Sequence, residues 1–270
     1  MSGNRIGSLR VSSPESFRLA KCDPGDTLGW HKDTAAAELQ AVKLKLDELQ
    51  QRLAAEGERS VLLVLQAMDA AGKDGTIRAI LSGLNPAGVT VTGFKVPTDR
   101  ERAQDFLWRV HAACPADGDI GVFNRSHYED VLVVRVKGFA PRRVWSKRFQ
   151  HINEFERMLS DEGTTIIKCF LNVSKVVQAR RFQDRLDDPT KNWKFRSGDL
   201  EDRRLWSKFQ LAYEDAIRKT STSYAPWYVV PADRNWVRNL AVAKILLSAL
   251  QQVDPQFPSP EPGIADIKIV

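Results

Sequence analysis

Five short apolar runs, separated by segments with a helical pattern, constrain the fold of this chain more than any other feature. The runs span residues 61–66, 89–96, 119–123, 164–171 and 227–231. Their apolar character is continuous rather than alternating, which is typical of strands covered on both faces. The connections are long enough to hold crossover helices between parallel strands. The sequence therefore predicts an α/β domain with a central parallel five-stranded sheet and flanking helices.

Several connecting segments have clear helical signals. Residues 34–56 are rich in Ala, Leu, Glu, Lys and Gln, with apolar residues at three- and four-residue spacing, and they predict an amphipathic helix. Residues 235–250 predict a last helix with a broad apolar face. Residues 129–136 are ambiguous, because their valine content favours a strand while their place after a buried strand favours a helix; we expect a helix. Residues 199–219 predict one continuous helix.

The domain organisation follows from this alternation, because five strands are enough for one domain spanning residues 1–270. Residues 1 to about 30 mix Ser, Gly, Pro and basic residues without a period, which predicts an arm with little regular structure. The tail from about residue 253 to residue 270 holds four of the thirteen prolines and is expected to be extended or loose.

Composition narrows the possible environments and partners. Forty Lys plus Arg against thirty-four Asp plus Glu gives a net charge of +6, which favours polyanionic partners and leaves nucleic acid, phosphates and anionic lipid open. Three cysteines without CxxC spacing argue against a disulfide framework or a zinc site and are typical of the reducing cytoplasm. The apolar runs are far shorter than the ~20 residues of a membrane span, so no anchoring is expected.

Residues 67–76, AMDAAGKDGT, follow the first apolar run and precede a helical pattern, which is the context of a P-loop. Small residues let successive backbone N–H groups turn toward an anion, the helix N-terminus adds its dipole, and a lysine reaches across the phosphates. Lys73 occupies the lysine position. The residues expected to contact phosphate here are Ala71, Gly72, Asp74, Gly75 and Thr76. The alternative is a turn that only joins a strand to a helix.

This loop departs from the usual pattern in its metal ligand. Asp74 stands where a Ser or Thr hydroxyl normally meets Mg²⁺. Asp69 could supply a carboxylate oxygen instead, since Mg²⁺ prefers a few carboxylates together with phosphate oxygens and water.

A second polar cluster follows the third apolar run, in the segment NRSHYED. Parallel strands gather ligands at their carboxyl ends, and Asn124 stands where P-loop enzymes place an acid. An amide brings no charge to a metal, so Asp69, Glu129 or Asp130 would have to carry that role. Arg125 has the planar fork that suits phosphate oxygens. The alternative is a structural turn in which Arg125 pairs with a neighbouring acid.

An arginine-rich helical segment lies between the fourth and fifth runs, where a closing lid would sit in a P-loop fold. Its candidate phosphate-binding residues are Arg180, Arg181, Arg185 and Lys194. Because acidic residues interleave with them, a solvated helix with ion pairs four residues apart fits the pattern equally well.

Four motifs, AMDAAGKDGTI, VFNRSHYEDVLVVRV, RRFQDRLDDPTKNWKF and APWYVVPADRNW, together resemble the second family of polyphosphate kinases over about residues 26–250. The resemblance implies a thymidylate-kinase-like P-loop kinase fold with a helical lid over about residues 175–220. It also implies Mg²⁺-dependent phosphoryl transfer between inorganic polyphosphate and a nucleotide, and assembly into homodimers or homotetramers.

The resemblance also assigns expected roles. Asp69 looks like the acid that helps to hold Mg²⁺, Lys73 like the lysine that grips phosphate, and Arg125 like the arginine near the transferred group. The lid motif would contribute Arg180, Arg185 and Lys194. The form NRSHYED is similar to the subgroup that phosphorylates nucleoside monophosphates as well as diphosphates, which makes AMP to ADP, and on to ATP, the expected reaction.

The expected chemistry is an in-line attack by a nucleotide phosphate oxygen on the terminal phosphoryl group of polyphosphate, without a covalent protein intermediate. Two alternatives stay open. One is an ATP-dependent kinase of a nucleotide or small metabolite on the same fold. The other is a non-catalytic nucleic-acid-binding protein, which we do not expect because no recognition module is present.

Overall fold

The apolar runs of the sequence form a five-stranded parallel sheet in a computed structural model that describes residues 5–264, 267 and 269. The strand order is β2-β3-β1-β4-β5, and every neighbouring pair is parallel. The strands are β1 (Ser60–Gln66), β2 (Val89–Gly93), β3 (Ile120–Asn124), β4 (Thr164–Asn172) and β5 (Trp227–Pro231). The predicted fold class is confirmed, because only crossover connections on the faces can join strands in this way.

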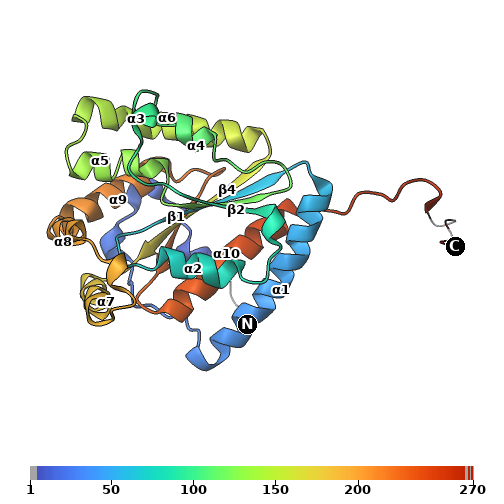
Figure 1. Cartoon of the computed structure of the whole chain (residues 1–270), viewed down its shortest axis with the longest axis horizontal. Coiled ribbons are helices and arrows are strands. Elements are labelled where there is room, and N and C mark those ends of the chain that lie inside the picture. The colour runs from blue at the N-terminus through green and yellow to red at the C-terminus, as the bar shows by residue number, and fades with distance from the viewer. Residues whose placement is uncertain (1–4, 265–266, 268, 270) are drawn as a thin grey trace.

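Helices cover both faces of this sheet, with α1, α2 and α10 on one side and α5, α6 and α9 on the other (Figure 1). The α-helices are α1 (Lys32–Glu56), α2 (Lys73–Leu81), α3 (Asp99–Arg102), α4 (Trp108–His111), α5 (Val133–Val136), α6 (Arg142–Asp161), α7 (Lys175–Asp187), α8 (Ser197–Arg204), α9 (Trp206–Thr220) and α10 (Asn235–Val253). Short 3-10 helices are η1 (Gly7–Leu9), η2 (Pro14–Ser16), η3 (Leu19–Lys21), η4 (Pro86–Gly88), η5 (His127–Asp130) and η6 (Asn192–Lys194).

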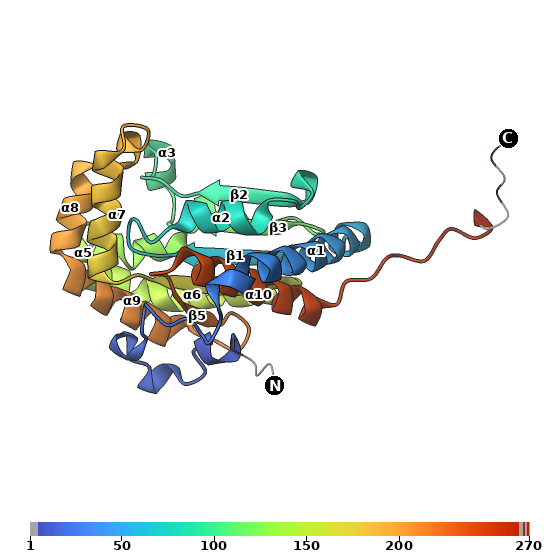
Figure 2. The ribbon, with the colours of Figure 1, turned by 90° about the horizontal axis from the view of Figure 1, so that it is seen from below.

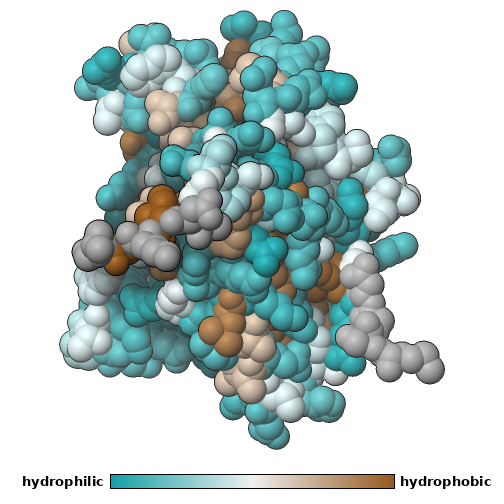
Figure 3. All heavy atoms as spheres, turned by 90° about the vertical axis from the view of Figure 1, so that its right-hand side faces the viewer, coloured by the Kyte–Doolittle hydropathy of each residue, from teal (hydrophilic) through white to brown (hydrophobic). Residues whose placement is uncertain are grey.

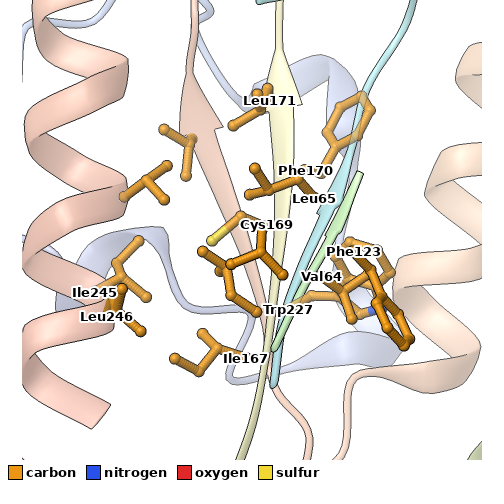
Figure 4. Close-up of a cluster of buried hydrophobic side chains, with 14 of the residues drawn as sticks. Val64, Leu65, Phe123, Ile167, Cys169, Phe170, Leu171, Trp227, Ile245 and Leu246 are labelled. Atoms are coloured by element: carbon orange, nitrogen blue, oxygen red, sulfur yellow. The ribbon is translucent and has the colours of Figure 1, made fainter. Parts of the chain in front are cut away.

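The core forms on both faces of the central strands. Every residue of β1 is buried, in agreement with its continuous apolar run. Side chains alternate along β4, so that Cys169 lies on the face covered by α10 while the Phe170 ring packs against Tyr213 of α9, with 4.4 Å between ring centroids. Figure 4 shows Ile245 and Leu246 of α10 directed at this sheet. The two packed faces fix the positions of the loops at the strand ends.

Three local expectations have different outcomes in the structure. The run at residues 89–96 was expected to be covered on both faces, but β2 is an edge strand with exposed residues, so the two-sided burial prediction is wrong there. The single helix predicted over residues 199–219 is divided at Leu205 into α8 and α9. The ambiguous segment 129–136 is mainly helical, as expected: it contains the end of η5, a turn at residues 131–132, and α5.

The terminal segments lie at the periphery. Residues 7–21 form η1 to η3, and Arg10 makes an isolated bridge to Tyr228 beside β5. After α10 the chain leaves the body of the molecule (Figure 2).

The face in Figure 3 is mostly hydrophilic, with scattered apolar side chains of the kind that protein surfaces ordinarily carry. Within the described ranges, no helix is long and apolar enough to cross a membrane.

Candidate phosphate-binding site

The loop between β1 and α2 is shaped to present backbone N–H groups. Ala70 has φ of 61° and Gly72 has φ of 107°, so the backbone turns sharply before α2 begins at Lys73. A Cβ atom at Gly72 would be strained at this φ and would also collide with the Arg238 guanidinium. The first turn of a helix has N–H groups without intrahelical partners, and here those groups stand at the carboxyl end of β1.

The carbonyl groups of the same loop are bound by side chains from three elements. Lys73 Nζ lies 3.1 Å from the Ala67 carbonyl oxygen, and Gln178 of α7 donates to the Asp69 carbonyl at 3.0 Å. Arg181 of α7 donates to the carbonyl oxygens of Ala70 and Ala71 at 3.0 and 2.9 Å, and Arg238 of α10 donates to Ala71 at 2.9 Å. These contacts fix the orientation of the peptide planes in the loop.

Lys73 is only 9% exposed, and it lies among charges of both signs. Burial and the neighbouring Arg125 lower the pKa of Lys73 to about 8, while Asp69, Glu129 and Asp74 act in the opposite direction. An anion bound at the loop would, like these carboxylates, raise the pKa of Lys73 and favour its charged amine.

Arg125 lies at the carboxyl end of β3, beside the loop, because β3 and β1 are neighbours in the sheet. Its backbone is left-handed, with φ of 65°, and its guanidinium donates to Asp69 Oδ1 at 2.6 Å and to Glu129 Oε2 at 3.4 Å. Glu129 and Asp69 raise the pKa of Arg125 against the effect of burial. The pairing with an acid that we considered as an alternative is therefore present, and it brings three predicted site residues together.

Asn124 and Asp74 form a contact between the end of β3 and the first turn of α2. Asn124 Nδ2 donates to Asp74 Oδ1 at 2.6 Å. The two departures from the common P-loop pattern are Asp74 in place of a Ser or Thr and Asn124 in place of an acid. The hydrogen bond shows that these two residues contact each other.

The predicted metal ligands are not gathered into one cluster. Asp69 and Glu129 line a pocket together with Asp202 of α8 and apolar residues of α5 and α9, whereas Asp130 pairs with Arg148 at 2.7 Å. Among the described residues there is no group of three or more His, Cys, Asp or Glu side chains arranged to hold a metal ion. The donor set nevertheless fits Mg²⁺, which is commonly held by one or two carboxylates together with substrate phosphates and water.

The predicted lid residues take different positions beyond the carboxyl ends of the strands, where Figure 2 shows α7 and α8. Arg180 and Lys194 are exposed. Arg185 donates to the Lys194 carbonyl at 3.1 Å and lies 3.7 Å from Asp199. Arg181 contacts carbonyl oxygens behind the loop, a position that differs from the direct phosphate contact suggested by its spacing.

His127 lies in a buried polar network. Its Nε2 is 3.2 Å from Glu156 of α6, and Glu156 also accepts from the Tyr128 hydroxyl at 2.8 Å. Lys168 of β4 forms an ion pair with Glu156 and donates to the Thr220 carbonyl at 2.7 Å. The network anchors η5, which contains Glu129 and begins two residues after Arg125.

Sequence reasoning missed Arg238 and Gln178, which are 3% and 1% exposed. Arg238 donates to the Thr76 hydroxyl at 2.6 Å as well as to the loop. A basic residue on a helix that is otherwise apolar in its buried positions was the available signal for Arg238, because a buried charge requires polar partners. Gln178 offers no comparable signal.

A doubly covered parallel sheet with an anion-binding loop at the carboxyl end of β1, and a lysine and an arginine beside it, defines a phosphotransferase of the P-loop class. The family model for polyphosphate kinase 2 matches residues 29–258. The chain belongs to the polyphosphate kinase 2 family.

Individual relatives agree with this assignment. An AMP/ADP-polyphosphate phosphotransferase of Meiothermus ruber is 56% identical over 262 residues, which are 96% of this chain and 98% of the relative. An ADP-polyphosphate phosphotransferase of Rhodopseudomonas palustris is 43% identical, with 81% and 80% of the two chains covered. The crystal structure of polyphosphate kinase 2 from Arthrobacter aurescens TC1 superposes with a TM-score of 0.93 at 44% identity, covering 97% of this chain and 94% of that one.

Proposed function

We propose that this protein transfers the terminal phosphoryl group of inorganic polyphosphate to a nucleotide in a Mg²⁺-dependent reaction, converting AMP to ADP and ADP to ATP reversibly. The observation that carries the proposal is the loop at the end of β1, whose carbonyls accept from Lys73 and Gln178 and whose Asp69 carboxylate pairs with Arg125. The relatives named as AMP/ADP- and ADP-polyphosphate phosphotransferases support the same reaction.

Binding of the donor would use the loop amides and Lys73, which together neutralise several phosphate oxygens. Arg125 would stabilise charge on the transferring group in the pocket that it lines with Asp69 and Glu129. The exposed Arg180 and Lys194 of the α7–α8 region would meet the polyanion from the opposite side, so that this region acts as a lid.

No strong general base is needed, because the attacking oxygen of a nucleotide phosphate is already anionic. His127, two residues after Arg125, is 1% exposed and bonded to Glu156, so it is not available to accept a substrate proton. Positioning and electrostatic stabilisation would therefore supply the catalysis.

Mg²⁺ would be held by Asp69, with Glu129 as the second carboxylate lining the pocket, and when bound it would neutralise charge on the phosphates. Asp130 stays engaged with Arg148 in this arrangement. A cytoplasmic location and a homodimeric or homotetrameric assembly complete the proposal.

An ATP-dependent kinase is the less favoured reading. Asp74 replaces the hydroxyl that ordinary ATP sites use for Mg²⁺, and its carboxylate is bound to Asn124.

The proposal is tested with purified protein, Mg²⁺ and long-chain polyphosphate, offering AMP, ADP, GMP and GDP separately and separating the nucleotides by chromatography. Product should require polyphosphate and should be absent with Lys73→Ala. The matched control is Lys43→Ala, a lysine on α1 whose amine bonds to Ser82 on the surface, and it should retain activity. Product formation with ATP but not with polyphosphate would contradict the proposal.

A further inference from the structure

Two arginines lie behind the phosphate loop without a carboxylate partner. Arg238 is 3% exposed, and its hydrogen bonds go to neutral oxygens of Ala71, Thr76, Asn235 and Asn239. In the part of the chain that the structure describes, no ion pair includes Arg238 or Arg181. A buried charge without an opposite charge costs several kcal/mol, so this arrangement needs a physical reason.

Arg181 is only partly buried, and burial lowers its pKa while the nearby Asp233 and Asp184 act in the opposite direction. Its terminal nitrogens are engaged by the carbonyl oxygens of Ala70, Ala71, Ala232 and Asp233 and by the side chain of Asn235. The carboxylate of Asp233 itself accepts from the Ser174 backbone N–H at 2.8 Å. Arg181 therefore joins the phosphate loop to the turn after β5 through neutral groups.

The position of the two arginines adds to the cost of their charges. Gly72 is the N-cap of α2, and a Cβ at Gly72 or Gly75 would lie against the guanidinium of Arg238. The N-terminus of a helix carries partial positive charge, which is unfavourable for a cation. Burial and the proximity of Arg181 accordingly lower the pKa of Arg238 to about 9.

An anion on the other side of the loop would compensate all of these positive charges. The carbonyls of Ala70 and Ala71 accept from the two arginines, and an anion bound at the first turn of α2 would meet the N–H groups that lack intrahelical partners. We propose that Arg238 and Arg181 are positioning residues, which orient the loop through its carbonyls and whose charges, which form no ion pair among the described residues, take bound polyphosphate as their counter-charge.

This inference rests on the proposed function, and it assigns binding energy to residues that do not touch the donor. Removing either charge should weaken polyphosphate binding and raise the KM for polyphosphate with a smaller change in kcat. A purely structural role would instead lower stability and active fraction, with no change in the affinity of the folded protein.

The experiment titrates tripolyphosphate, in the presence of Mg²⁺, into wild type, Arg238→Met, Arg181→Met and Arg238→Lys by calorimetry. The expected loss of affinity is about tenfold or more for each methionine variant, which is the scale of a lost charge interaction. Arg238→Lys should recover part of the affinity, because it keeps the charge and loses the planar fork.

The matched control is Arg59→Met, which also removes one positive charge: Arg59 donates to a backbone carbonyl, that of Val253, but lies at the opposite end of β1. It should bind as wild type does. Circular dichroism establishes whether each variant is folded. If one of the two methionine variants does not fold, the other still tests the inference.

The inference is overturned if a folded methionine variant binds tripolyphosphate with the wild-type affinity. In that case wild type would still transfer phosphoryl groups from polyphosphate, and the proposed function would stand. If wild type neither binds tripolyphosphate nor forms product from polyphosphate, the proposed function itself fails.

Discussion

Replacement of Glu156 by glutamine tests the buried ion pair that anchors η5 next to the site. Glu156 and Lys168 are 1% and 0% exposed, and Lys168 also donates to the Tyr128 hydroxyl at 2.9 Å. Removal of one partner leaves a buried charge uncompensated, which costs about 3–5 kcal/mol. With an unfolding entropy of about 2.1 cal/mol/K per residue, 270 residues give about 0.57 kcal/mol/K. The expected decrease in Tm is therefore about 5–9 °C.

The assay is thermal unfolding at pH 7, with a control on the same helix. Arg157 and Asp161 form an exposed pair at 3.9 Å, with 65% and 69% of their side chains accessible. Asp161→Asn should cost no more than about 1 kcal/mol, as exposed pairs do. Adding Lys168→Met to Glu156→Gln should recover stability, because it removes the unpaired charge. Equal shifts for Glu156→Gln and Asp161→Asn would refute the reasoning.

Three further predictions concern charge at and near the site. Burial raises the pKa of Glu156, but Lys168 and His127 lower it, and overall it lies below the ordinary 4.5. The difference in free energy of unfolding between wild type and Glu156→Gln, measured in urea, should therefore be constant above pH 4.5 and shrink below it. A pH-independent gap down to pH 2 would contradict this. Because the pKa of Lys73 is about 8, the affinity of the free protein for tripolyphosphate should fall as pH rises through 8. The Lys73→Arg variant should lack that fall. Identical pH profiles for wild type and Lys73→Arg in calorimetry would contradict this prediction. Asn124→Asp places a carboxylate against Asp74 and should lower Tm. Adding Asp74→Asn should restore Tm. A double variant that is no more stable than Asn124→Asp alone would contradict the contact between these two side chains.

The sheet could be predicted because burial on both faces requires continuous apolar runs, and β1 and β4 carry such runs. The same rule failed for β2, since an edge strand is covered less, and Thr90 and Val91 of its VTVTG sequence are exposed. The division between α8 and α9 at Leu205 was missed because no glycine or proline marks it. Tertiary packing, rather than local propensity, determines that boundary.

The parts of the site that depend on neighbouring strand ends could be predicted from the sequence, whereas the parts that depend on long-range contacts could not. Asp69, Lys73 and Arg125 lie together because the ends of neighbouring parallel strands meet, which the sequence pattern allows one to foresee. The contacts of Gln178 and Arg238 with the loop join residues more than one hundred positions apart, and no local pattern encodes them. The position of Asp130 depends on Arg148 of α6, which periodicity also does not reveal.

The central claim is direct phosphoryl transfer from polyphosphate to a nucleotide, and terminally labelled polyphosphate tests it most directly. The protein is mixed with labelled donor, Mg²⁺ and AMP, the reaction is stopped within the first turnovers, and label is counted in nucleotide, orthophosphate and protein. We predict label in the β-phosphate of ADP, none bound to protein, and none transferred by Lys73→Ala. Label released only as orthophosphate, or held covalently by the protein before AMP is added, would contradict the account.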